Sequence, residues 1–459
     1  MKFGGTSVKD AERMRTVVTL ALKERADGHE VAIVASAVTG VTNSLVKMVS
    51  PPPQESEVDG HIERLEQLHF AIARDLFPDG ARRAEAQREL ERHLTRLRKV
   101  LQGIVFTEEL TPRTRDLVLS FGERLSCTLL HQEFMARGGH AVLLESDQIG
   151  MLTDGKFGQA SPLLPQIEKN FQKTVVPHMV EGRVPVITGY FGHDNQLRTT
   201  TFGRGGSDYA AAIVAYAVNA DVCEIWTDVD GFMSCDPRFI PEATLIAETS
   251  YEAAAELAYF GAKVLHARTV EPLEQKSIPI LIKNTYNPSA PGTWIVEQSK
   301  ETGRAMTAIA YKDKLASIRL YGPGLSFAPE VFARIIETIA QIGISLYAIS
   351  TSASNCVLLV DAGEVERAAK SLEAMKADVV DRIYKTDGLA LICCVGERMA
   401  QTPGIAAQVF GAIGREQVNI EMISEGGSPV AVNFAVKETQ LEAAVRVLHK
   451  EFFGPTPGR

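Results

Sequence analysis

The sequence predicts an α/β protein with a mainly parallel sheet and helices on both of its faces, followed by two ferredoxin-like domains of βαββα topology. Short apolar runs typical of buried strands alternate with helical segments between residues 31 and 282, as in parallel sheets. Beyond residue 315 the chain repeats itself with a period of about 74 residues, which indicates a duplicated domain. Because a βαββα unit leaves one sheet edge open, we expect that edge to be covered by the partner copy.

Composition and charge narrow the class of protein. The chain has 459 residues, a formal net charge of −9 and 45% hydrophobic residues, so it is an ordinary globular protein and not a general nucleic-acid binder, which would be basic. Its six cysteines show no C-x-x-C spacing, and Cys393 and Cys394 are adjacent, which argues against a zinc site or a disulfide framework. The sequence shows neither a signal peptide nor an apolar run of membrane length, so we expect a cytoplasmic protein.

The first residues combine a cation with a glycine turn. Lys2 ends a short predicted strand, Gly4 and Gly5 form the turn, and two hydroxyl residues then open a helix predicted over residues 9–25. This order places an ammonium group beside free backbone N–H groups, which suits a phosphate. An ordinary turn before an N-capped helix is the alternative interpretation.

A hydroxyl-rich loop follows the next predicted strand. The strand covers residues 31–35, and the loop over residues 36–43 contains Ser36 and Thr42 and leads to a helix predicted over residues 44–49. The strand is apolar throughout, as strands buried on both faces are.

Two long amphipathic segments predict a helical hairpin over residues 55–107. Apolar residues recur in steps of four and three, which is the period of one helix face. They are Ile62, Leu65, Leu68, Ile72 and Leu76 in the first segment and Leu90, Leu94, Leu97, Leu101 and Ile104 in the second. We interpret the region as an αα-hairpin inserted into the α/β domain, with solvated charged faces.

A glycine within a predicted helix lies beside a carboxylate. Gly122 precedes Glu123 and Arg124 in a segment whose apolar residues have helical spacing. The glycine suggests a close approach to another element, and a surface pair of Glu123 with Arg124 is the alternative.

A glycine-rich turn at residues 200–208 precedes a run of small residues that predicts a helix. Three of the residues 203–206 are glycines and allow close approach of the backbone to a ligand, and Ser207 and Asp208 are good N-cap residues. The helix start favours an anion, and Arg204 adds a fork suited to a carboxylate or phosphate. A tight turn with an exposed arginine is the alternative.

The remaining strands and helices alternate along the chain. Strands are predicted over residues 141–144, 184–188, 222–227 and 278–282, and helices over residues 163–181, 209–218 and 251–264. The strand 222–227 ends in an acidic turn with Asp228 and Asp230, at the carboxyl end of a strand where open α/β sheets bind ligands. We interpret His266 as structural, and Lys263 as either a site residue or a plain cation at a helix end.

Five motifs, taken together and in this order, resemble those of aspartate kinases (aspartokinases) of the amino-acid-kinase superfamily. They are KFGGTS at residues 2–7, FGER at 121–124, FGRGGSD at 202–208, TDVDG at 227–231 and FGAK at 260–263. Each is weak alone, whereas the set is specific and the likeness covers nearly the whole chain. The repeats resemble the paired ACT domains of aspartate kinases. The resemblance implies a catalytic domain over residues 1–300 and ACT domains over residues 313–385 and 387–453.

The resemblance implies ATP-dependent phosphorylation of the L-aspartate side chain to 4-phospho-L-aspartate, the first step of lysine, threonine and methionine biosynthesis. It assigns catalysis to Lys2, which would contact the phosphates, and to Asp208, which would orient Lys2. Arg204 would pair with the substrate α-carboxylate and Glu123 with its α-amino group. The implied substrate-binding residues are Ser36, Thr42, Glu123, Arg204, Gly205 and Ser207.

The same resemblance implies a nucleotide site, a cofactor and partners. The ATP-binding residues would be Lys2, Phe3, Gly4, Gly5, Thr227, Asp228, Asp230, Met233, Arg238, Lys263 and Val264. Met233 stands where the family usually has a tyrosine. Mg²⁺ is expected on ATP oxygens and waters without a protein metal site. Lysine or threonine would act at the ACT domains of a homodimer or larger homo-oligomer, and no nucleic-acid or membrane partner is expected.

Two other functions fit parts of the sequence. Another amino-acid kinase, acting on glutamate or a carbamate, would share the turn chemistry, but the paired C-terminal domains and Glu123 count against it. A non-enzymatic amino-acid sensor on a kinase scaffold is the alternative from another class. Intact Lys2, Arg204 and Asp208 argue against that sensor.

Overall fold

The computed structural model describes residues 1–78, 80–261, 264–300, 305–322, 329–375, 380–424 and 427–454. The chain divides into two compact units. The first comprises Met1–Phe232 and Val264–Glu297, and the second comprises Met233–Lys263 and Gln298–Arg459. Each unit has its own sheet and core, whereas the domain boundaries implied by the family resemblance stay predictions.

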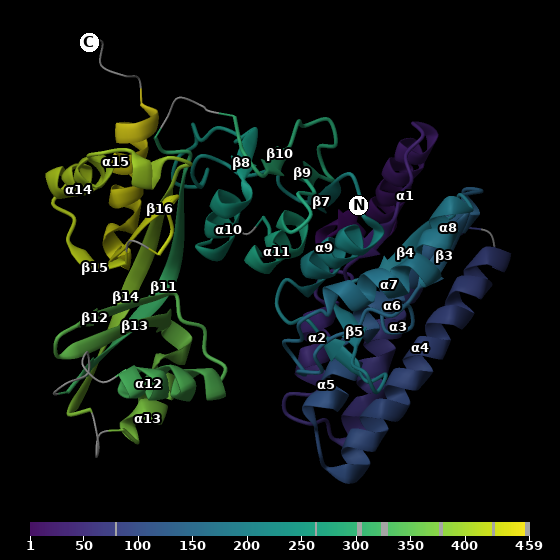
Figure 1. The fold of residues 1–459 in the computed structure, drawn as a ribbon. Coiled ribbons are helices and arrows are strands. Elements are labelled where there is room, and N and C mark those ends of the chain that lie inside the picture. Colours follow the sequence, from purple (N-terminus) through teal and green to yellow (C-terminus); the bar gives the residue numbers. More distant parts are fainter. Residues whose placement is uncertain are drawn as a thin grey trace. The chain divides into compact units, whose positions relative to one another are not determined.

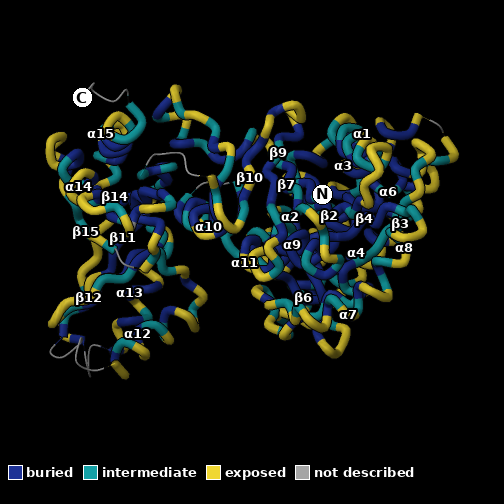
Figure 2. The backbone as a smooth tube through the Cα atoms, turned by 45° about the horizontal axis from the view of Figure 1, so that its top comes forward, coloured by how far each residue is buried: buried dark blue, intermediate teal, exposed yellow. Residues whose placement is uncertain are grey.

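The first unit is built on a mainly parallel sheet, as predicted. The strands that belong to this unit lie in the order β3-β4-β2-β1-β7-β9-β10. Each neighbouring pair among them is parallel except the antiparallel β9 and β10. The bounds are β1 Lys2–Phe3, β2 Ile33–Ala35, β3 Ala141–Leu144, β4 Val184–Thr188, β7 Cys223–Thr227, β9 Ile280–Asn284 and β10 Thr293–Val296. The hairpin of β5 Phe191–His193 and β6 Thr199–Thr201 is separate. Figure 2 shows the strands β2, β4 and β7 mainly buried.

Helices cover both faces of this sheet. Helix α6 contacts β2, β3 and β4 on one face, and α9 contacts β1, β2 and β7 on the other. The bounds are α1 Ala11–Ala26, α2 Val41–Met48, α3 Glu55–Leu76, α4 Gly80–Thr107, α5 Pro112–Leu119, α6 Phe121–Ala136, α7 Leu164–Thr174, α8 Val176–Val180, α9 Gly206–Val218 and α11 Val270–Glu274. Short 3-10 turns occupy Gly5–Val8 and Ala267–Thr269. None of the helices in the described ranges has the length and apolar character needed to cross a membrane.

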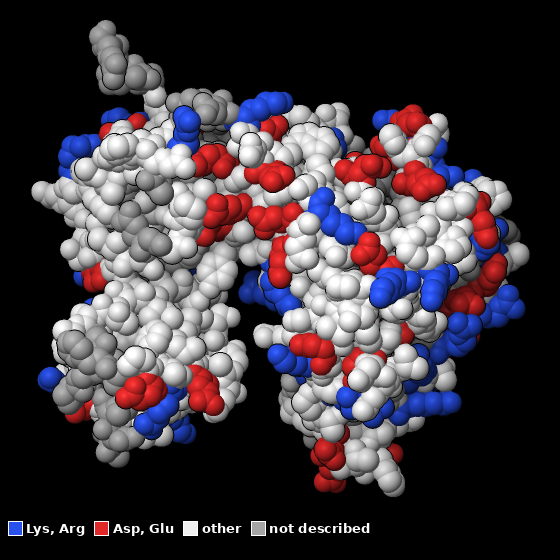
Figure 3. All heavy atoms as spheres, in the orientation of Figure 1, with Lys and Arg blue, Asp and Glu red and all other residues white. Residues whose placement is uncertain are grey.

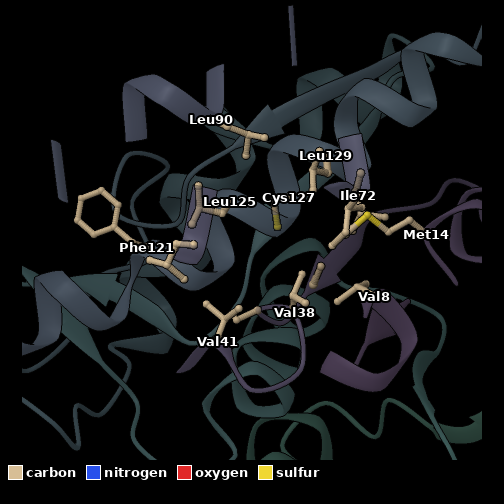
Figure 4. Packing of buried hydrophobic residues seen from close by; sticks show 14 of the residues in the cluster. Val8, Met14, Val38, Val41, Ile72, Leu90, Phe121, Leu125, Cys127 and Leu129 are labelled. Carbon is tan, nitrogen blue, oxygen red and sulfur yellow. The ribbon is translucent and has the colours of Figure 1, made fainter. Parts of the chain in front are cut away.

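The helices α3 and α4 pack side by side (Figure 1) and bury the apolar faces that their sequences predict. Leu90 of α4 joins Ile72 of α3 and Leu125 of α6 in one core (Figure 4). The prediction for Leu68 is wrong, because this side chain is 38% exposed and His69 is buried in its place. A step of four from Leu65 leads to His69, and a further step of three leads to Ile72. Figure 3 shows charges of both signs along α4, as expected of a solvated face.

Several helix starts differ from those predicted. Helix α1 begins at Ala11, where Asp10 accepts the N–H of Arg13 (2.9 Å), so the hydroxyl residues before it lie in the 3-10 turn. Helix α2 begins three residues before its predicted start. Helix α9 begins at Gly206 with Gly205 as the N-cap residue. Ser207 and Asp208 are residue types preferred at the N-cap position, but Gly205 takes that position because glycine adopts a positive φ readily.

The second unit contains both copies of the repeat. Each copy has the order strand, helix, strand, strand, helix, and their strands form one sheet in the order β12-β13-β11-β14-β16-β15. The bounds are β11 Ala308–Tyr321, α12 Pro329–Gln341, β12 Ala348–Ser352, β13 Asn355–Asp361, α13 Val365–Glu373, β14 Arg382–Val395, α14 Ile405–Arg415, β15 Ile420–Ser424, β16 Ala431–Lys437 and α15 Leu441–Phe453. The unit also includes β8 Glu248–Ser250 and α10 Tyr251–Tyr259.

The long strands β11 and β14 run through both copies (Figure 1). Residues 315–321 of β11 pair with β13 of the first copy, while residues 308–312 pair with residues 391–395 of β14. Conversely, residues 382–386 of β14 pair with β11 beside the first copy. Each copy therefore covers the open sheet edge of the other, which confirms the prediction. The long strand of one copy extends along the edge that the other copy leaves open.

Candidate active site

The loops that follow the parallel strands β1, β2 and β4 meet at one edge of the sheet of the first unit, beside the end of β7. The N–H of Gly4 donates to the Trp226 carbonyl (3.2 Å), and the N–H of Ser36 donates to that of Phe3 (3.0 Å). The N–H of Gly189, just after β4, donates to the Ala35 carbonyl (3.0 Å). Ligands of open α/β sheets bind at such an edge, so the predicted site residues of this unit lie where a ligand is expected.

Lys2 and Asp208 form an ion pair at this edge. Their side chains are 9% and 16% exposed, so solvent screens the pair only weakly. A Cβ added to Gly4 would lie 3.4 Å from the Lys2 ammonium nitrogen, which shows that the ammonium group faces the turn formed by Gly4 and Gly5. Asp208 lies in the first turn of α9, where a carboxylate is favoured by the helix dipole. The structure thus brings together the two predicted catalytic residues.

Glu123 is a buried carboxylate with one free oxygen. It is 2% exposed, and its Oε1 accepts the N–H of Ala37 (3.1 Å) and the hydroxyl of Ser207 (3.3 Å). Within the described residues its buried Oε2 has no hydrogen-bond partner. Burial raises the pKa of Glu123 to about 8, although both hydrogen bonds oppose the rise. An unpartnered carboxylate oxygen in such a place suits a cationic ligand group.

Glycines let the surrounding elements converge on Glu123. A Cβ on Gly122 would lie 2.7 Å from the Cβ of Ala37, and one on Gly5 would lie 3.0 Å from the Ala37 carbonyl oxygen. A Cβ on Gly189 would lie 3.0 Å from that of Ser207. The close approach predicted beside Glu123 is therefore confirmed, and its partner is the loop after β2. This loop carries Ser36 and runs into α2, which holds Thr42 in its first turn.

The glycine turn, residues 202–208, presents Arg204 to solvent. Gly203 and Gly205 have φ values of +77° and +71°, and a Cβ at Gly205 would clash with the His266 imidazole. Arg204 is exposed, and across the described part of the chain its guanidinium makes no hydrogen bond or ion pair. His266 packs against the turn and accepts the N–H of Arg268 (3.4 Å), a structural position as predicted.

Arg124 belongs to a buried ionic cluster that the sequence did not reveal. Its side chain is 0% exposed and forms ion pairs with Glu145 and Asp147, the latter at 2.5 Å. The alternative interpretation, in which Glu123 and Arg124 form a surface pair, is therefore wrong. His93 Nε2 lies 3.7 Å from Glu145, and burial lowers the pKa of His93 to about 4, so the ring is neutral at pH 7. In the sequence, the only local sign of this cluster is a charged residue between buried positions of an amphipathic helix.

The acidic turn after β7 in the first unit holds three of the predicted nucleotide-site residues, Thr227, Asp228 and Asp230. The hydroxyl of Thr227 donates to Asp228 (3.3 Å). Asp230 accepts the side-chain amides of Asn284 (2.8 Å) and Asn287 (3.3 Å), and neither asparagine was predicted. Val264 lies in this unit as well and is half-buried.

Two further residues that were predicted to bind the nucleotide, Met233 and Arg238, lie in the second unit. Met233 forms an isolated bridge with Leu245. Arg238, 75% exposed at its side chain, pairs with Asp236 at 2.6 Å and donates to the Tyr311 hydroxyl (3.1 Å). Lys263 lies outside the described residues.

Comparisons with known proteins agree on the family. The amino acid kinase family matches residues 1–284, and ACT domains match residues 310–374 and 392–452. Aspartokinase 2, chloroplastic, of Arabidopsis thaliana is 32% identical over 477 aligned residues that cover 100% of this chain and 84% of the relative. The structure of E. coli aspartokinase III with aspartate and ADP (R-state) superposes with a TM-score of 0.84 at 29% identity, covering 98% of this chain and 99% of the other. The same enzyme with lysine and aspartate (T-state) gives a TM-score of 0.81 at 30% identity, with 98% of each chain covered.

Proposed function

Because this chain belongs to the amino acid kinase family, and within it to the aspartokinases, we propose that it transfers the γ-phosphoryl group of ATP to the side-chain carboxylate of L-aspartate. The products are 4-phospho-L-aspartate and ADP. One observation carries this proposal: two consecutive residues at the start of α9, Ser207 and Asp208, contact Glu123 and Lys2, respectively. An anion-binding ammonium group and a cation-binding carboxylate are thus held side by side.

The chemistry needs no general base. The aspartate side chain has a reference pKa of about 3.9 and is ionised at pH 7, so it attacks the γ-phosphorus directly. Catalysis then rests on alignment of the carboxylate and on neutralising charge across the transferred phosphoryl group. Lys2 and the N–H group of Gly5 supply that charge, whereas the expected N–H group of Gly4 already donates to the Trp226 carbonyl. Asp208 orients the Lys2 ammonium group through their ion pair.

The amino-acid end of the substrate is held by two charged groups. Glu123 accepts the α-amino group through its free oxygen, and Arg204 pairs with the α-carboxylate at the N-terminus of α9. Backbone at Gly205 and the hydroxyls of Ser36, Thr42 and Ser207 complete this end. An α-amino acid placed in this way directs its side chain toward Lys2.

The nucleotide end is proposed on Phe3 and the turns after β1 and β7, with Thr227, Asp228, Asp230, Met233, Arg238, Lys263 and Val264 as lining residues. The described residues contain no group of three or more His, Cys, Asp or Glu arranged to hold a metal ion. We propose that Mg²⁺ arrives on the ATP oxygens with waters, which fits its preference for phosphate and water ligands. When bound, it supplies charge neutralisation on the phosphates.

Aspartate binding should release a proton near neutral pH. In the empty site at pH 7, Glu123 is protonated because its pKa is raised to about 8, and the bound α-ammonium group favours the carboxylate. We expect calorimetry at pH 7, in buffers of different ionisation enthalpy, to show release of about one proton per aspartate. The KM for aspartate should fall as pH rises toward 8, by at most about tenfold per unit.

The control for this prediction is Glu123→Gln, which cannot ionise. It should bind aspartate weakly and without a buffer-dependent enthalpy. A wild-type binding enthalpy that is the same in every buffer would contradict the role of Glu123.

We propose that the ACT domains regulate this activity, in the first step of lysine, threonine and methionine biosynthesis. One contact supports a link: Tyr311 on β11 donates to Asp236 (2.7 Å), which holds Arg238 of the proposed nucleotide site. We expect lysine or threonine to bind and to change activity with aspartate. If calorimetry detected binding of neither amino acid, this regulation would be ruled out.

We also propose that the protein forms a homo-oligomer. Its six free, buried cysteines suit a reducing, cytoplasmic compartment.

Acceptor specificity separates this function from another amino-acid kinase. ADP release should be measured with L-aspartate, L-glutamate and carbamate as acceptors, each with ATP and Mg²⁺. Turnover with aspartate only is the expected result. Preference for glutamate or carbamate would assign the chain a different substrate.

A further inference from the structure

Two segments of the first unit lie against each other beside the aspartate site. One is the end of β6 with the start of the glycine turn, at Thr201 and Phe202, and the other is the loop over residues 158–160. The N–H of Ala160 donates to the Thr201 carbonyl (2.9 Å). A Cβ on Gly203 would lie 2.8 Å from the Gly158 carbonyl oxygen, so the turn lies this close to the loop only because residue 203 is a glycine.

A buried carboxylate joins the two segments from one side. Asp116 of α5 is 1% exposed. It accepts the N–H of Gly158 (2.8 Å) in the loop. It also accepts both the N–H (2.8 Å) and the hydroxyl (2.9 Å) of Thr201. Hydrogen bonds to a charged acceptor are stronger than neutral ones, so this residue fixes the spacing of the loop and the strand end.

A guanidinium group joins the same segments through their carbonyl groups. Arg268 donates to the Phe202 carbonyl and to the Ala160 carbonyl, each at 3.2 Å. Its guanidinium carbon lies 4.4 Å from the centre of the Tyr209 ring, and Tyr209 belongs to the first turns of α9. The planar fork therefore ties the start of the glycine turn, the loop and the helix that follows the turn into one arrangement.

The two side chains are complementary in chemistry and position. Asp116 collects N–H groups from both segments, and Arg268 donates to carbonyl groups of both. Asp116 lies 85 residues along the chain from Thr201, and Arg268 lies 66 residues from Phe202. Arg204, Ser207 and Asp208 follow directly after the residues that Asp116 and Arg268 hold, within the same glycine turn.

We infer that Asp116 and Arg268 are positioning residues for aspartate, which hold the glycine turn so that Arg204 meets the substrate α-carboxylate. This inference rests on the proposed function. A displacement of about 1 Å far from the reacting atoms can cost about 100-fold in rate, so the clamp bears directly on use of the substrate.

The test uses Arg268→Lys and Asp116→Ala in the full chain. Lysine retains the charge but cannot bridge two carbonyl groups with a planar fork. Alanine removes the acceptor of all three hydrogen bonds, whereas asparagine could keep them by donating its amide to the Thr201 hydroxyl. For each we expect the KM for aspartate to rise about tenfold or more, with the KM for ATP within about twofold of wild type. Circular dichroism establishes that each variant is folded.

The matched control is Arg137→Lys, because Arg137 also bridges two partners, Glu133 and Thr19, each at 2.7 Å, but lies at the end of α6. It should leave both KM values unchanged. An unchanged aspartate KM in the two test variants, or an equal rise in the KM for aspartate and for ATP, would overturn the inference. Wild-type protein without aspartate kinase activity would remove the proposed function and this inference with it.

Discussion

Replacing Lys2 with alanine is expected to abolish phosphorylation of aspartate while the protein stays folded. The Lys2 ammonium group is the cation that pairs with Asp208 and faces the turn formed by Gly4 and Gly5. Loss of one group that neutralises charge in a phosphoryl-transfer transition state typically costs about 10³–10⁵ in rate. We expect kcat to fall by about 10³ or more, measured by coupled release of ADP.

Two further variants make this result interpretable. Lys2→Met keeps the aliphatic stem and should be as inactive as Lys2→Ala, which separates loss of charge from loss of packing. Lys9→Ala removes a half-exposed lysine that pairs at 3.9 Å with Asp10, and it should retain wild-type kcat. Near wild-type turnover in either Lys2 variant would take Lys2 out of the mechanism.

Arg204→Lys is expected to raise the KM for aspartate strongly. The guanidinium group of Arg204 offers a planar pair of donors that matches a carboxylate, and an ammonium group is a point charge that cannot replace it. Because a hydrogen bond to a charged group contributes about 1.5–3 kcal/mol, we expect a rise of about 10- to 100-fold. The KM for ATP should not change, since Arg204 is assigned to the amino acid.

The control for this variant is Arg198→Lys. Arg198 pairs with Asp194 at 2.5 Å on the neighbouring hairpin, outside the proposed site, and its replacement should leave the aspartate KM at the wild-type value. An aspartate KM for Arg204→Lys equal to that of wild type would refute the contact with the α-carboxylate.

Much of the fold follows from local patterns in the sequence. The predicted strands 141–144 and 184–188 coincide with β3 and β4, because apolar runs bounded by polar residues define such strands well. The internal repeat correctly predicts that the two small domains share an edge. It could not show that β11 and β14 each extend through both copies, since strand pairing depends on partners far apart along the chain.

The site was predictable where its residues lie in motifs, and not where partners are distant. Lys2, Asp208 and Glu123 stand in recognisable motifs, and the structure brings the first two together and places Glu123 beside them through Ser207. By contrast, Asp116 and Arg268 act on backbone atoms far along the chain. A lone charged residue in a helix carries no signal of such contacts.

The most direct test of the account is whether this protein makes an acyl phosphate from aspartate. Purified protein with ATP, Mg²⁺ and L-aspartate should be incubated with hydroxylamine, which traps 4-phospho-L-aspartate as the hydroxamate. We expect hydroxamate that depends on both ATP and aspartate and is absent with Lys2→Ala. No hydroxamate from folded wild-type protein, with or without added lysine or threonine, would contradict the account and favour an amino-acid sensor on a kinase scaffold.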